Sequence, residues 1–341
     1  MKKQGIVKKV LALAIAAGMS LSLLACGSGG DSNTLIIYSG LHDFDTTALA
    51  EAFTEETGIE VEFIVGNIGD LTARVDAESD NPQADILIGG SAELYDPIRD
   101  SLQQYTSPLA EEIDSRFNDP YGYWQGWFTG VLAILYNTDR FEAEMAPLGV
   151  QPPETWDDLL DPAWEGEFLM GDPATAGGAR IFIANQIFRL GEEEAWQFME
   201  ELDNNVHHYT PGAVTPIDMV GQGEFLIGMS WAHPTLDAIE EGQPITMVIP
   251  PYTAYEIGAV AILAGAPNVE NAQLFIDWLL SREAQELNVN LANRYSVRSD
   301  VDSPGGMPLL EDISLVDYDR PAAGAMMTDM VEIFQERIQG H

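Results

Sequence analysis

A single histidine occupies the point where a predicted strand passes into a predicted helix. In the stretch IGMSWAHPTLDA, residues 227–238, apolar and small side chains alternate as far as Trp231, and a helical pattern begins after His233 and Pro234. An imidazole at such a turn can donate a hydrogen bond to an oxygen of a bound molecule. His233 is therefore a candidate for contact with a ligand. The alternative is that it caps the helix or fills a gap in the core.

A glycine-rich turn offers a second place for ligand chemistry. In GDPATAGGAR, residues 171–180, the residues Thr175, Gly177 and Gly178 come directly before a predicted helix. Free backbone N–H groups at a helix N-terminus attract anions, and Arg180 would add a guanidinium on the next turn. These residues favour the capture of an anionic group, although they could also form only a turn and a cap.

The chain lacks the residues that most enzyme mechanisms require. The segment GGSAE at residues 89–93 does not fit the Gly-x-Ser-x-Gly nucleophile pattern, and all four lysines lie near the start of the chain, so no phosphate-loop lysine follows later. His207 and His208 are adjacent, so a strand would turn them to opposite faces, and zinc-ligand spacing is absent. We expect a protein that is not an enzyme and that holds no metal and no cofactor.

Strands and helices alternate along most of the chain, which predicts an α/β fold with right-handed crossovers. Apolar periodicity and turn residues predict strands at 34–39, 59–65, 84–90, 131–137, 166–173, 227–231, 244–250 and 255–263, and helices at 45–58, 70–79, 179–190, 192–205, 215–221 and 268–287. Ligands of such sheets bind at the carboxyl ends of the strands. In the first half of the chain, that rule makes candidates of Ser39, His42, Gly90 and Ser91.

The first 25 residues have the pattern of a secretory signal. A basic start is followed by an apolar stretch at residues 10–25, which is shorter than the roughly 20 residues that span a bilayer. The sequence Leu-Leu-Ala-Cys ending at Cys26 looks like a bacterial lipobox, in which the cysteine becomes lipidated. We expect residues 1–25 to be a lipoprotein signal peptide and residues 26–33 a lipid-anchored flexible tether, so that the protein is exported and faces the periplasm or the extracellular space.

The chain is strongly acidic. It has 55 acidic and 15 basic residues, and loss of the four leader lysines would lower the formal charge from −40 to −44. A nucleic-acid-binding protein needs a basic surface, and so does electrostatic attachment to anionic lipid, so both are excluded. A folded chain with such self-repulsion is favoured where salt screens it, which predicts a saline habitat.

Five segments together resemble the family-1 extracellular solute-binding proteins of ABC importers, in the branch of ferric-iron, thiamine, phosphonate and sugar-phosphate receptors. The segments are LIIYSGLHDFDTTALAEAFTEETGIEVEF, NPQADILIGG, ILYNTD, WDDLLDPAWEGE and NAQLFIDWLLSREAQE, and the similarity runs from Thr34 to about Ser299. The resemblance implies that the protein is the monomeric substrate-binding subunit of an importer, with a permease and an ATPase as partners.

The same resemblance implies a type II periplasmic-binding-protein fold with mixed sheets. Two lobes, residues 34–130 with 256–341 and residues 131–255, would be joined by two crossing strands near Gly130 and Glu256. The ligand would lie in the interlobe cleft, and the lobes would close on it by a hinge motion.

The branch also bears on the ligand. Iron receptors carry two consecutive tyrosines at the turn that reads Ala232-His233 in this chain. They also carry a carboxylate after the third strand, where this chain has Gly90 or Ser91. Only His42 matches one of their ligands, the histidine after the first strand. Sugar-phosphate receptors carry His-Asp at this turn, where the present chain has His233 and Pro234.

The crossing strand of those receptors has a glutamate that accepts hydroxyl hydrogen bonds, a role that falls to Glu256. We expect a small anionic organic solute, phosphorylated in the manner of a sugar phosphate or a phosphonate. The alternatives are a ferric-ion receptor that uses His42 and His233, a sensor or adhesion lipoprotein that has lost transport, and a hydrolase with an unfamiliar set of catalytic residues.

Overall fold

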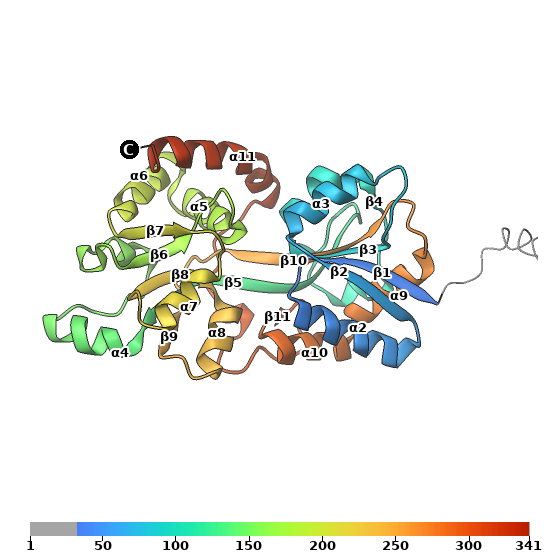
Figure 1. Cartoon of the computed structure of the whole chain (residues 1–341), viewed down its shortest axis with the longest axis horizontal. Helices are drawn as coiled ribbons and strands as arrows, with labels where there is room; N and C mark the ends of the chain where they lie inside the picture. Colours follow the sequence, from blue (N-terminus) through green and yellow to red (C-terminus); the bar gives the residue numbers. More distant parts are fainter. Residues whose placement is uncertain (1–32, 341) are drawn as a thin grey trace, which may run out of the picture. The chain divides into compact units, whose positions relative to one another are not determined.

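The computed structural model describes residues 33–340 (Figure 1). The chain separates into two units, residues 1–33 and 34–341, and the second unit is a mixed α/β body. The predicted signal peptide, Cys26 and nearly all of the predicted tether lie outside the described residues. Among the described residues, no helix is both long and apolar enough to cross a membrane.

One part of the body, lobe 1, is defined by residues 34–130 and 256–298. β1 (Thr34–Ser39) pairs in parallel with β2 (Glu60–Val65) and β3 (Ile86–Ser91), and β10 (Tyr255–Leu263) runs antiparallel to β3. The first three residues of β3 are apolar and buried, as expected for a strand covered on both faces. The other elements of lobe 1 are α2 (Asp43–Thr57), α3 (Ile68–Ala77), β4 (Leu102–Gln103), α9 (Val269–Leu279), α10 (Arg282–Ala292) and β11 (Tyr295–Ser296).

One strand belongs to both lobes. β5 (Gln125–Asn137) has 13 residues, all of them buried. Its first half pairs with β10, and its second half pairs with β8 (Ile227–Trp231). The change of partner falls next to Gly130, which is paired with Glu256 of β10. β5 and β10 therefore carry the chain between the lobes.

Lobe 2 is defined by residues 131–255 and 320–340. Its strands continue the order from β5 through β8 and β6 (Phe168–Gly171) to β7 (Val206–Thr210), and β6 is parallel to both neighbours. The other elements are α4 (Thr138–Arg140), α5 (Gly177–Leu190), α6 (Glu192–Asp203), α7 (Thr215–Gly221), α8 (Ala232–Glu240), β9 (Ile245–Val248) and α11 (Arg320–Arg337).

The structure differs from the sequence prediction at two helices. The helix predicted over 268–287 is two helices, α9 and α10, because the Ser281 hydroxyl accepts a hydrogen bond from the Ala284 N–H and starts α10 afresh. The sequence also assigns all of residues 256–341 to lobe 1. α11 instead packs on α5 of lobe 2, where Phe334 lies edge-on to Tyr209 with ring centroids 5.1 Å apart. Residues 299–319 are thus a third connection between the lobes.

Candidate functional site

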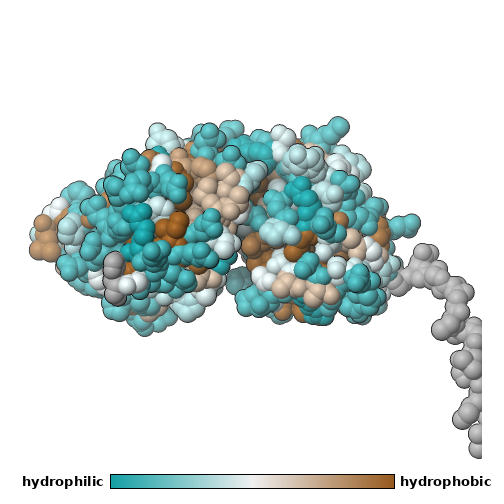
Figure 2. All heavy atoms as spheres, turned by 90° about the horizontal axis from the view of Figure 1, so that it is seen from above, coloured by the Kyte–Doolittle hydropathy of each residue, from teal (hydrophilic) through white to brown (hydrophobic). Residues whose placement is uncertain are grey.

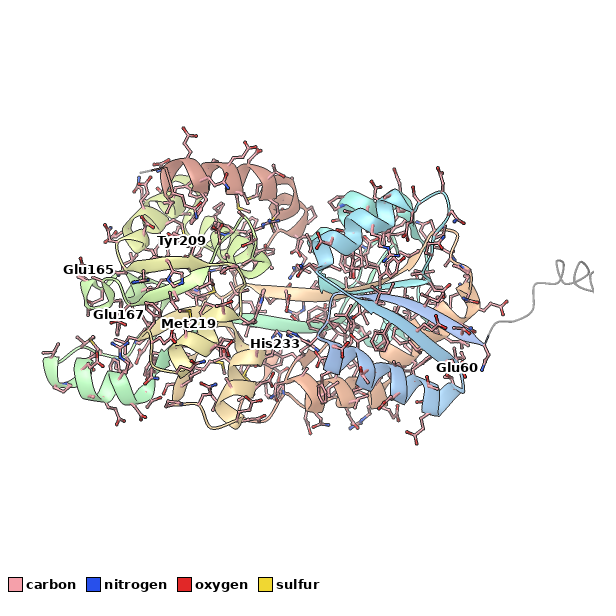
Figure 3. All side chains as sticks on the ribbon, in the orientation of Figure 1. Glu60, Glu165, Glu167, Tyr209, Met219 and His233 are labelled. Atoms are coloured by element: carbon pink, nitrogen blue, oxygen red, sulfur yellow. The ribbon has the colours of Figure 1, made fainter. Side chains whose placement is uncertain are left out.

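Two glycines on the crossing strands allow rings to lie directly against the backbone. A methyl group added to Gly130 would come within 2.9 Å of Nδ1 of His233 and 3.2 Å of Oε1 of Glu256. A methyl group on Gly258 would lie 1.9 Å from the ring of Phe128. The absence of these side chains brings His233 and Glu256 together at the crossing, and Figure 3 shows His233 beside it. A notch separates the lobes on the face drawn in Figure 2, where hydrophilic residues predominate.

His233 comes from lobe 2, in the first turn of α8. β8 ends at Trp231, and the Trp231 ring lies 6.5 Å from the imidazole at an angle of 30°. The residue is half-buried, and Nδ1 is a buried nitrogen with no hydrogen-bond partner among residues 33–340. Desolvation, together with the positive charges of Arg294 and His42, holds the pKa of His233 well below its usual value. The imidazole is therefore neutral at neutral pH, with one buried nitrogen left to bond a ligand.

Glu256 lies on β10 and is 8% exposed. Burial raises the pKa of its carboxyl to about 7; the Arg294 and Arg320 charges act against that rise, and the Glu93 charge adds to it. Because the carboxyl takes up or loses its proton near neutrality, the charge beside His233 changes within the physiological pH range. Perturbed groups of this kind concentrate at binding and catalytic sites.

Arg294 is a site residue that the sequence analysis did not identify. It follows Asn293, which ends α10 in the left-handed conformation with φ 49°. The side chain is buried and forms an ion pair of 2.7 Å with the buried Asp45, while its Cζ lies 4.8 Å from the centroid of the Phe128 ring. Its Nε is buried and has no partner within the described part of the chain. The only hint in the sequence is a single arginine between the end of a predicted helix and the aromatic Tyr295, in a chain with few arginines.

The glycine-rich turn at residues 171–180 contacts Trp231, which lies two residues before His233. Gly178 packs on Trp231, since a methyl group there would lie 3.1 Å from the indole Nε1, whereas Gly177 faces open space. The first hydrogen bonds of α5 are donated by Ala179 and Arg180 to the carbonyl of Ala176. The N–H groups of Gly177 and Gly178 precede them and can bond a ligand.

Thr175 and Arg180 differ in their contacts at this turn. Thr175 is exposed beside the helix start. Arg180 donates hydrogen bonds of 2.5 Å and 2.7 Å to the carbonyls of Pro173 and Ala174, and its contact with a ligand stays a prediction. Its guanidinium therefore braces the turn.

Two lobe 1 candidates have local structural roles. The Ser39 hydroxyl is fully buried, lies 2.7 Å from the Thr46 hydroxyl and accepts a hydrogen bond from the Leu41 N–H. Gly90 has φ +70°, and a methyl group there would lie 2.6 Å from Ile68. Both positions shape the turn at the ends of β1 and β3. Their contact with a ligand stays a prediction.

His42 and Ser91 are the other two lobe 1 candidates, and the charge of His42 acts on His233. His42 is exposed and lines a small pocket of about 180 Å³ together with residues of lobe 2, namely Val214, Ile217, Asp218, Pro234, Asp237, Ala238, Glu241 and Gln243. Ser91 ends β3 and donates a hydrogen bond to the buried carboxylate of Glu93. The structure thus brings His233 and Glu256 together at the crossing, with Gly178 against the neighbouring Trp231, and it places His42 in a pocket that Pro234, the residue after His233, also lines.

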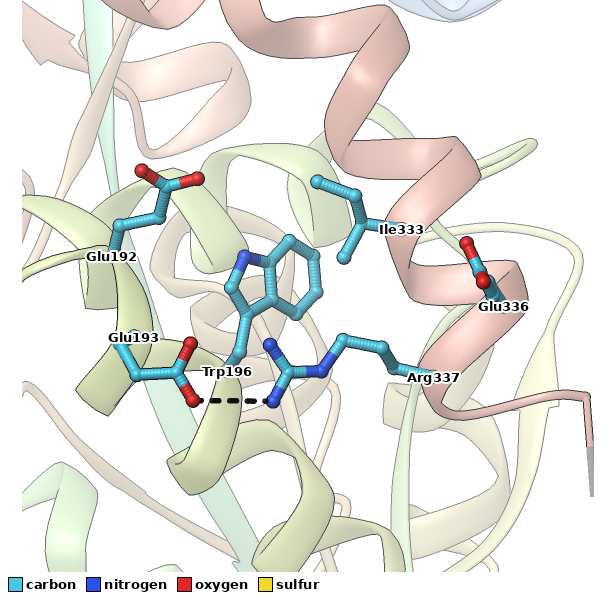
Figure 4. Close-up of a pocket in the computed structure, with 6 residues that line it drawn as sticks. All are labelled: Glu192, Glu193, Trp196, Ile333, Glu336 and Arg337. Atoms are coloured by element: carbon cyan, nitrogen blue, oxygen red, sulfur yellow. Dashed lines mark ion pairs between the residues drawn. The ribbon is translucent and has the colours of Figure 1, made fainter.

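A larger pocket of about 590 Å³ lies between α6 and α11 (Figure 4). Glu192, Glu193, Trp196, Ile333, Glu336 and Arg337 line it, and Arg337 forms an ion pair with Glu193. No candidate site residue contributes to this pocket. Across residues 33–340, no three or more histidine, aspartate or glutamate side chains are grouped so that they could hold a metal ion.

The architecture has close counterparts among solved structures. The periplasmic binding protein AfuA of Actinobacillus pleuropneumoniae, solved with exogenous fructose-6-phosphate bound, matches with a TM-score of 0.81 and 30% identity over 90% of this chain and 98% of that one. The apo ferric ion-binding protein A of Pasteurella haemolytica matches with a TM-score of 0.78 at 21% identity, over 89% of this chain and 98% of that one, and shows the fold alone. The fold is that of a type II periplasmic-binding protein, as the sequence predicts.

The family follows from the sequence comparisons. Residues 48–308 match the model of the bacterial extracellular solute-binding proteins, and an uncharacterised protein of Haemophilus influenzae is 35% identical over 298 residues, 84% of this chain and 83% of that one. A putative 2-aminoethylphosphonate-binding periplasmic protein of Salmonella typhimurium is 26% identical over 297 residues, 83% of this chain and 84% of its own length. This chain belongs to the bacterial extracellular solute-binding family.

Membership settles the general function. The chain is a periplasmic or extracellular substrate-binding protein of an ABC importer, it is not an enzyme, and its partners are a small solute and the permease and ATPase subunits. The prediction of a non-catalytic receptor is confirmed.

Proposed function

We propose that this receptor captures a small anionic organic solute, a sugar phosphate or a phosphonate, and presents it to the permease. The observation that carries the proposal is a pair of buried nitrogen atoms, Nε of Arg294 and Nδ1 of His233, that have no partner within residues 33–340. Both side chains lie against the ring of Phe128. Buried polar groups are nearly always satisfied, and the oxygen atoms of a bound anionic solute would satisfy both nitrogens.

The Arg294 guanidinium and the start of α5 attract an anion, whereas the carboxylates of Asp45 and Glu256 oppose that attraction. A unit negative charge about 5 Å from a guanidinium gains roughly 3 kcal/mol at an effective dielectric constant of 20. The N–H groups at the start of α5 add a favourable contribution of about 0.3–2 kcal/mol. Two relatives point to the same chemistry: AfuA was solved with fructose-6-phosphate, and the Salmonella relative bears the name of a 2-aminoethylphosphonate-binding protein.

A ferric-ion site fits the structure less well. An iron uptake protein of Synechocystis is 25% identical to this chain over 272 residues, so the alternative has a relative. A trivalent cation prefers oxygen ligands such as phenolates and carboxylates. Here the cation would meet the positive charge of Arg294, which already lowers the pKa of His233.

Calorimetry of the purified protein against fructose-6-phosphate, 2-aminoethylphosphonate and ferric citrate tests the assignment. We expect saturable binding of at least one phosphorylated compound and none of iron. Binding of ferric citrate alone would overturn the proposal in favour of the iron receptor. Native mass spectrometry of gently purified protein would identify a solute that is retained from the cell.

We propose further that the receptor is anchored through a lipid on Cys26. Cys26→Ser should move the protein from the membrane fraction to the soluble fraction or block removal of the leader, because the modified thiol would be its only covalent tether. Fractionation followed by immunoblotting measures this. Unchanged membrane retention with normal processing would contradict the lipid anchor.

We also propose adaptation to a saline habitat. Loss of the four leader lysines takes the formal charge from −40 to −44; this charge should lower the melting temperature in dilute buffer through self-repulsion, and molar salt should raise it as the screening length falls to about 3 Å. Thermal unfolding between about 0.05 and 3 M sodium chloride checks this. A melting temperature that is indifferent to salt would contradict the adaptation.

A further inference from the structure

The third connection runs alongside the crossing strands. After β11, which pairs with β5, residues 299–319 lead from lobe 1 to α11 on lobe 2. Thr253, just before β10, donates its N–H to the carbonyl of Ser314 at 3.1 Å and accepts from the N–H of Val316 at 3.0 Å. This part of the connection is therefore bonded to the chain directly before the β10 crossing.

Arg320, the first residue of α11, ties that helix to both lobe 1 and the crossing strand. It forms an ion pair of 2.6 Å with Glu93 of lobe 1 and donates a hydrogen bond of 2.8 Å to the carbonyl of Tyr255. Its Cζ lies 4.3 Å from the centroid of the Tyr255 ring. The side chains of Arg320 and Glu93 are only 13% and 3% exposed, so loss of the arginine would leave a buried, uncompensated carboxylate.

Glu93, the ion-pair partner of Arg320, also interacts with residues of the candidate site. The Glu93 carboxylate accepts the hydrogen bond from Ser91 at the end of β3, and its charge acts on Glu256 at the crossing. The other end of α11 lies near the glycine-rich turn at residues 171–180. Gln339, which follows α11, donates a hydrogen bond of 3.1 Å to Asp172 in that turn. The C-terminal segment thus contacts residues next to the site in both lobes, Glu93 in lobe 1 and Asp172 in lobe 2, without contributing a side chain to the site.

We propose that Arg320 is a positioning residue that fixes the ligand-facing end of β3 to the hinge through Glu93, so that ligand affinity depends on an ion pair outside the site. The inference rests on the proposed binding of an anionic solute. It extends that proposal by making the C-terminal connection part of the closure mechanism.

Arg320→Gln, compared with Arg337→Gln, tests the proposal. Both residues lie on α11, but the ion pairs of Arg337 with Glu193 and Glu200 are partly exposed, so we expect their loss to change stability little. With fructose-6-phosphate as the probe, we expect calorimetry to show at least tenfold weaker binding for Arg320→Gln and a change within about twofold for Arg337→Gln. Equal affinities for the wild type and Arg320→Gln would overturn the proposal.

A pH profile separates positioning from a merely structural effect. The charge of Glu256 opposes an anionic probe, so affinity should fall as the pH rises through the pKa of its carboxyl, which is about 7. Arg320→Gln removes a charge that lowers this pKa and leaves Glu93, which raises it. The fall should therefore move to higher pH, and Arg320→Lys should return it toward the wild-type position. A uniform loss of affinity with an unmoved midpoint would overturn the proposal.

Interlobe distance gives a readout that does not need the probe. Spin labels at Glu60→Cys on lobe 1 and Glu165→Cys on lobe 2, in a Cys26→Ser background, report the separation of the lobes (Figure 3). Arg320→Gln should broaden the distance distribution of the ligand-free protein, and Arg337→Gln should not. If the wild type binds no phosphorylated probe, the proposed solute is wrong, and this comparison still decides the role of Arg320: an unchanged distribution would refute it.

Discussion

Replacing His233 with alanine is expected to weaken binding of the phosphorylated solute by about tenfold to a hundredfold. The side chain lies against Gly130, next to Glu256, with a buried nitrogen that has no partner within residues 33–340. Without its donor, the ligand oxygen is unsatisfied in a desolvated site, which lowers the binding free energy by about 1–3 kcal/mol. Each 1.4 kcal/mol is a tenfold change in affinity. Calorimetry with the solute identified from the panel measures the loss.

The matched variants are chosen to separate binding from folding. His233→Asn keeps an amide N–H near the position of Nδ1 and should recover part of the affinity. His208→Ala removes an exposed imidazole from β7 and should bind as the wild type does. If His233→Ala unfolds the protein, or binds the solute as tightly as the wild type, then His233 is a core or capping residue and the alternative interpretation of the sequence holds.

The pH dependence of this hydrogen bond has a definite sign. In the free site the pKa of His233 lies well below its usual value. A bound anion favours the charged imidazole and raises that pKa, so binding takes up protons between the free and bound values. The affinity gained in this way is complete below the free pKa and is lost as the pH rises through the bound pKa. In His233→Ala this contribution disappears, and the dependence that comes from Glu256 and from the second ionisation of a phosphate ligand, at about pH 6, remains.

Local signals explain which parts of the fold the sequence predicts. The strand predicted at 34–39 is β1 with the same bounds, and the helix predicted at 179–190 begins two residues earlier, at Gly177. Apolar periodicity and glycine stops operate within a few residues, so they can be read from a single chain. The sequence does not predict the break between α9 and α10, because the apolar spacing continues through Ser281, while the serine hydroxyl restarts the helix.

The site is harder to predict because its contacts are distant along the chain. Arg294 pairs with Asp45 across 249 residues, and no local pattern connects the two. The position of His233 at a strand-to-helix turn is visible in the sequence, but its approach to Gly130 and Glu256 requires β5 and β10 to cross in register. The location of α11 on lobe 2 is likewise a tertiary contact, because the helix has no strong apolar stripe to indicate its partner.

Replacing Arg294 with glutamine should have the largest effect in the protein, because it acts on stability and on binding at once. Its ion pair with Asp45 is buried on both sides, with side chains 6% and 8% exposed. Removal of one partner from such a pair typically destabilises a protein by about 3–5 kcal/mol, since the other charge stays buried and unpaired. Urea unfolding should therefore show a clear loss of stability, whereas Arg282→Gln, which breaks an exposed pair with Glu286 on α10, should change it by less than about 1 kcal/mol.

A double variant separates the two effects of Arg294. Arg294→Gln combined with Asp45→Asn leaves two neutral amides that can bond each other, so most of the lost stability should return. Affinity for the anionic solute should not return, because the buried cation that attracts it is still absent. A charge-assisted hydrogen bond contributes about 1.5–3 kcal/mol, so binding should stay roughly tenfold to a hundredfold weaker in the restored double variant. Wild-type affinity in the stable double variant would show that Arg294 only holds Asp45 in place, and the anion would then be held by His233 and the N-terminus of α5 alone.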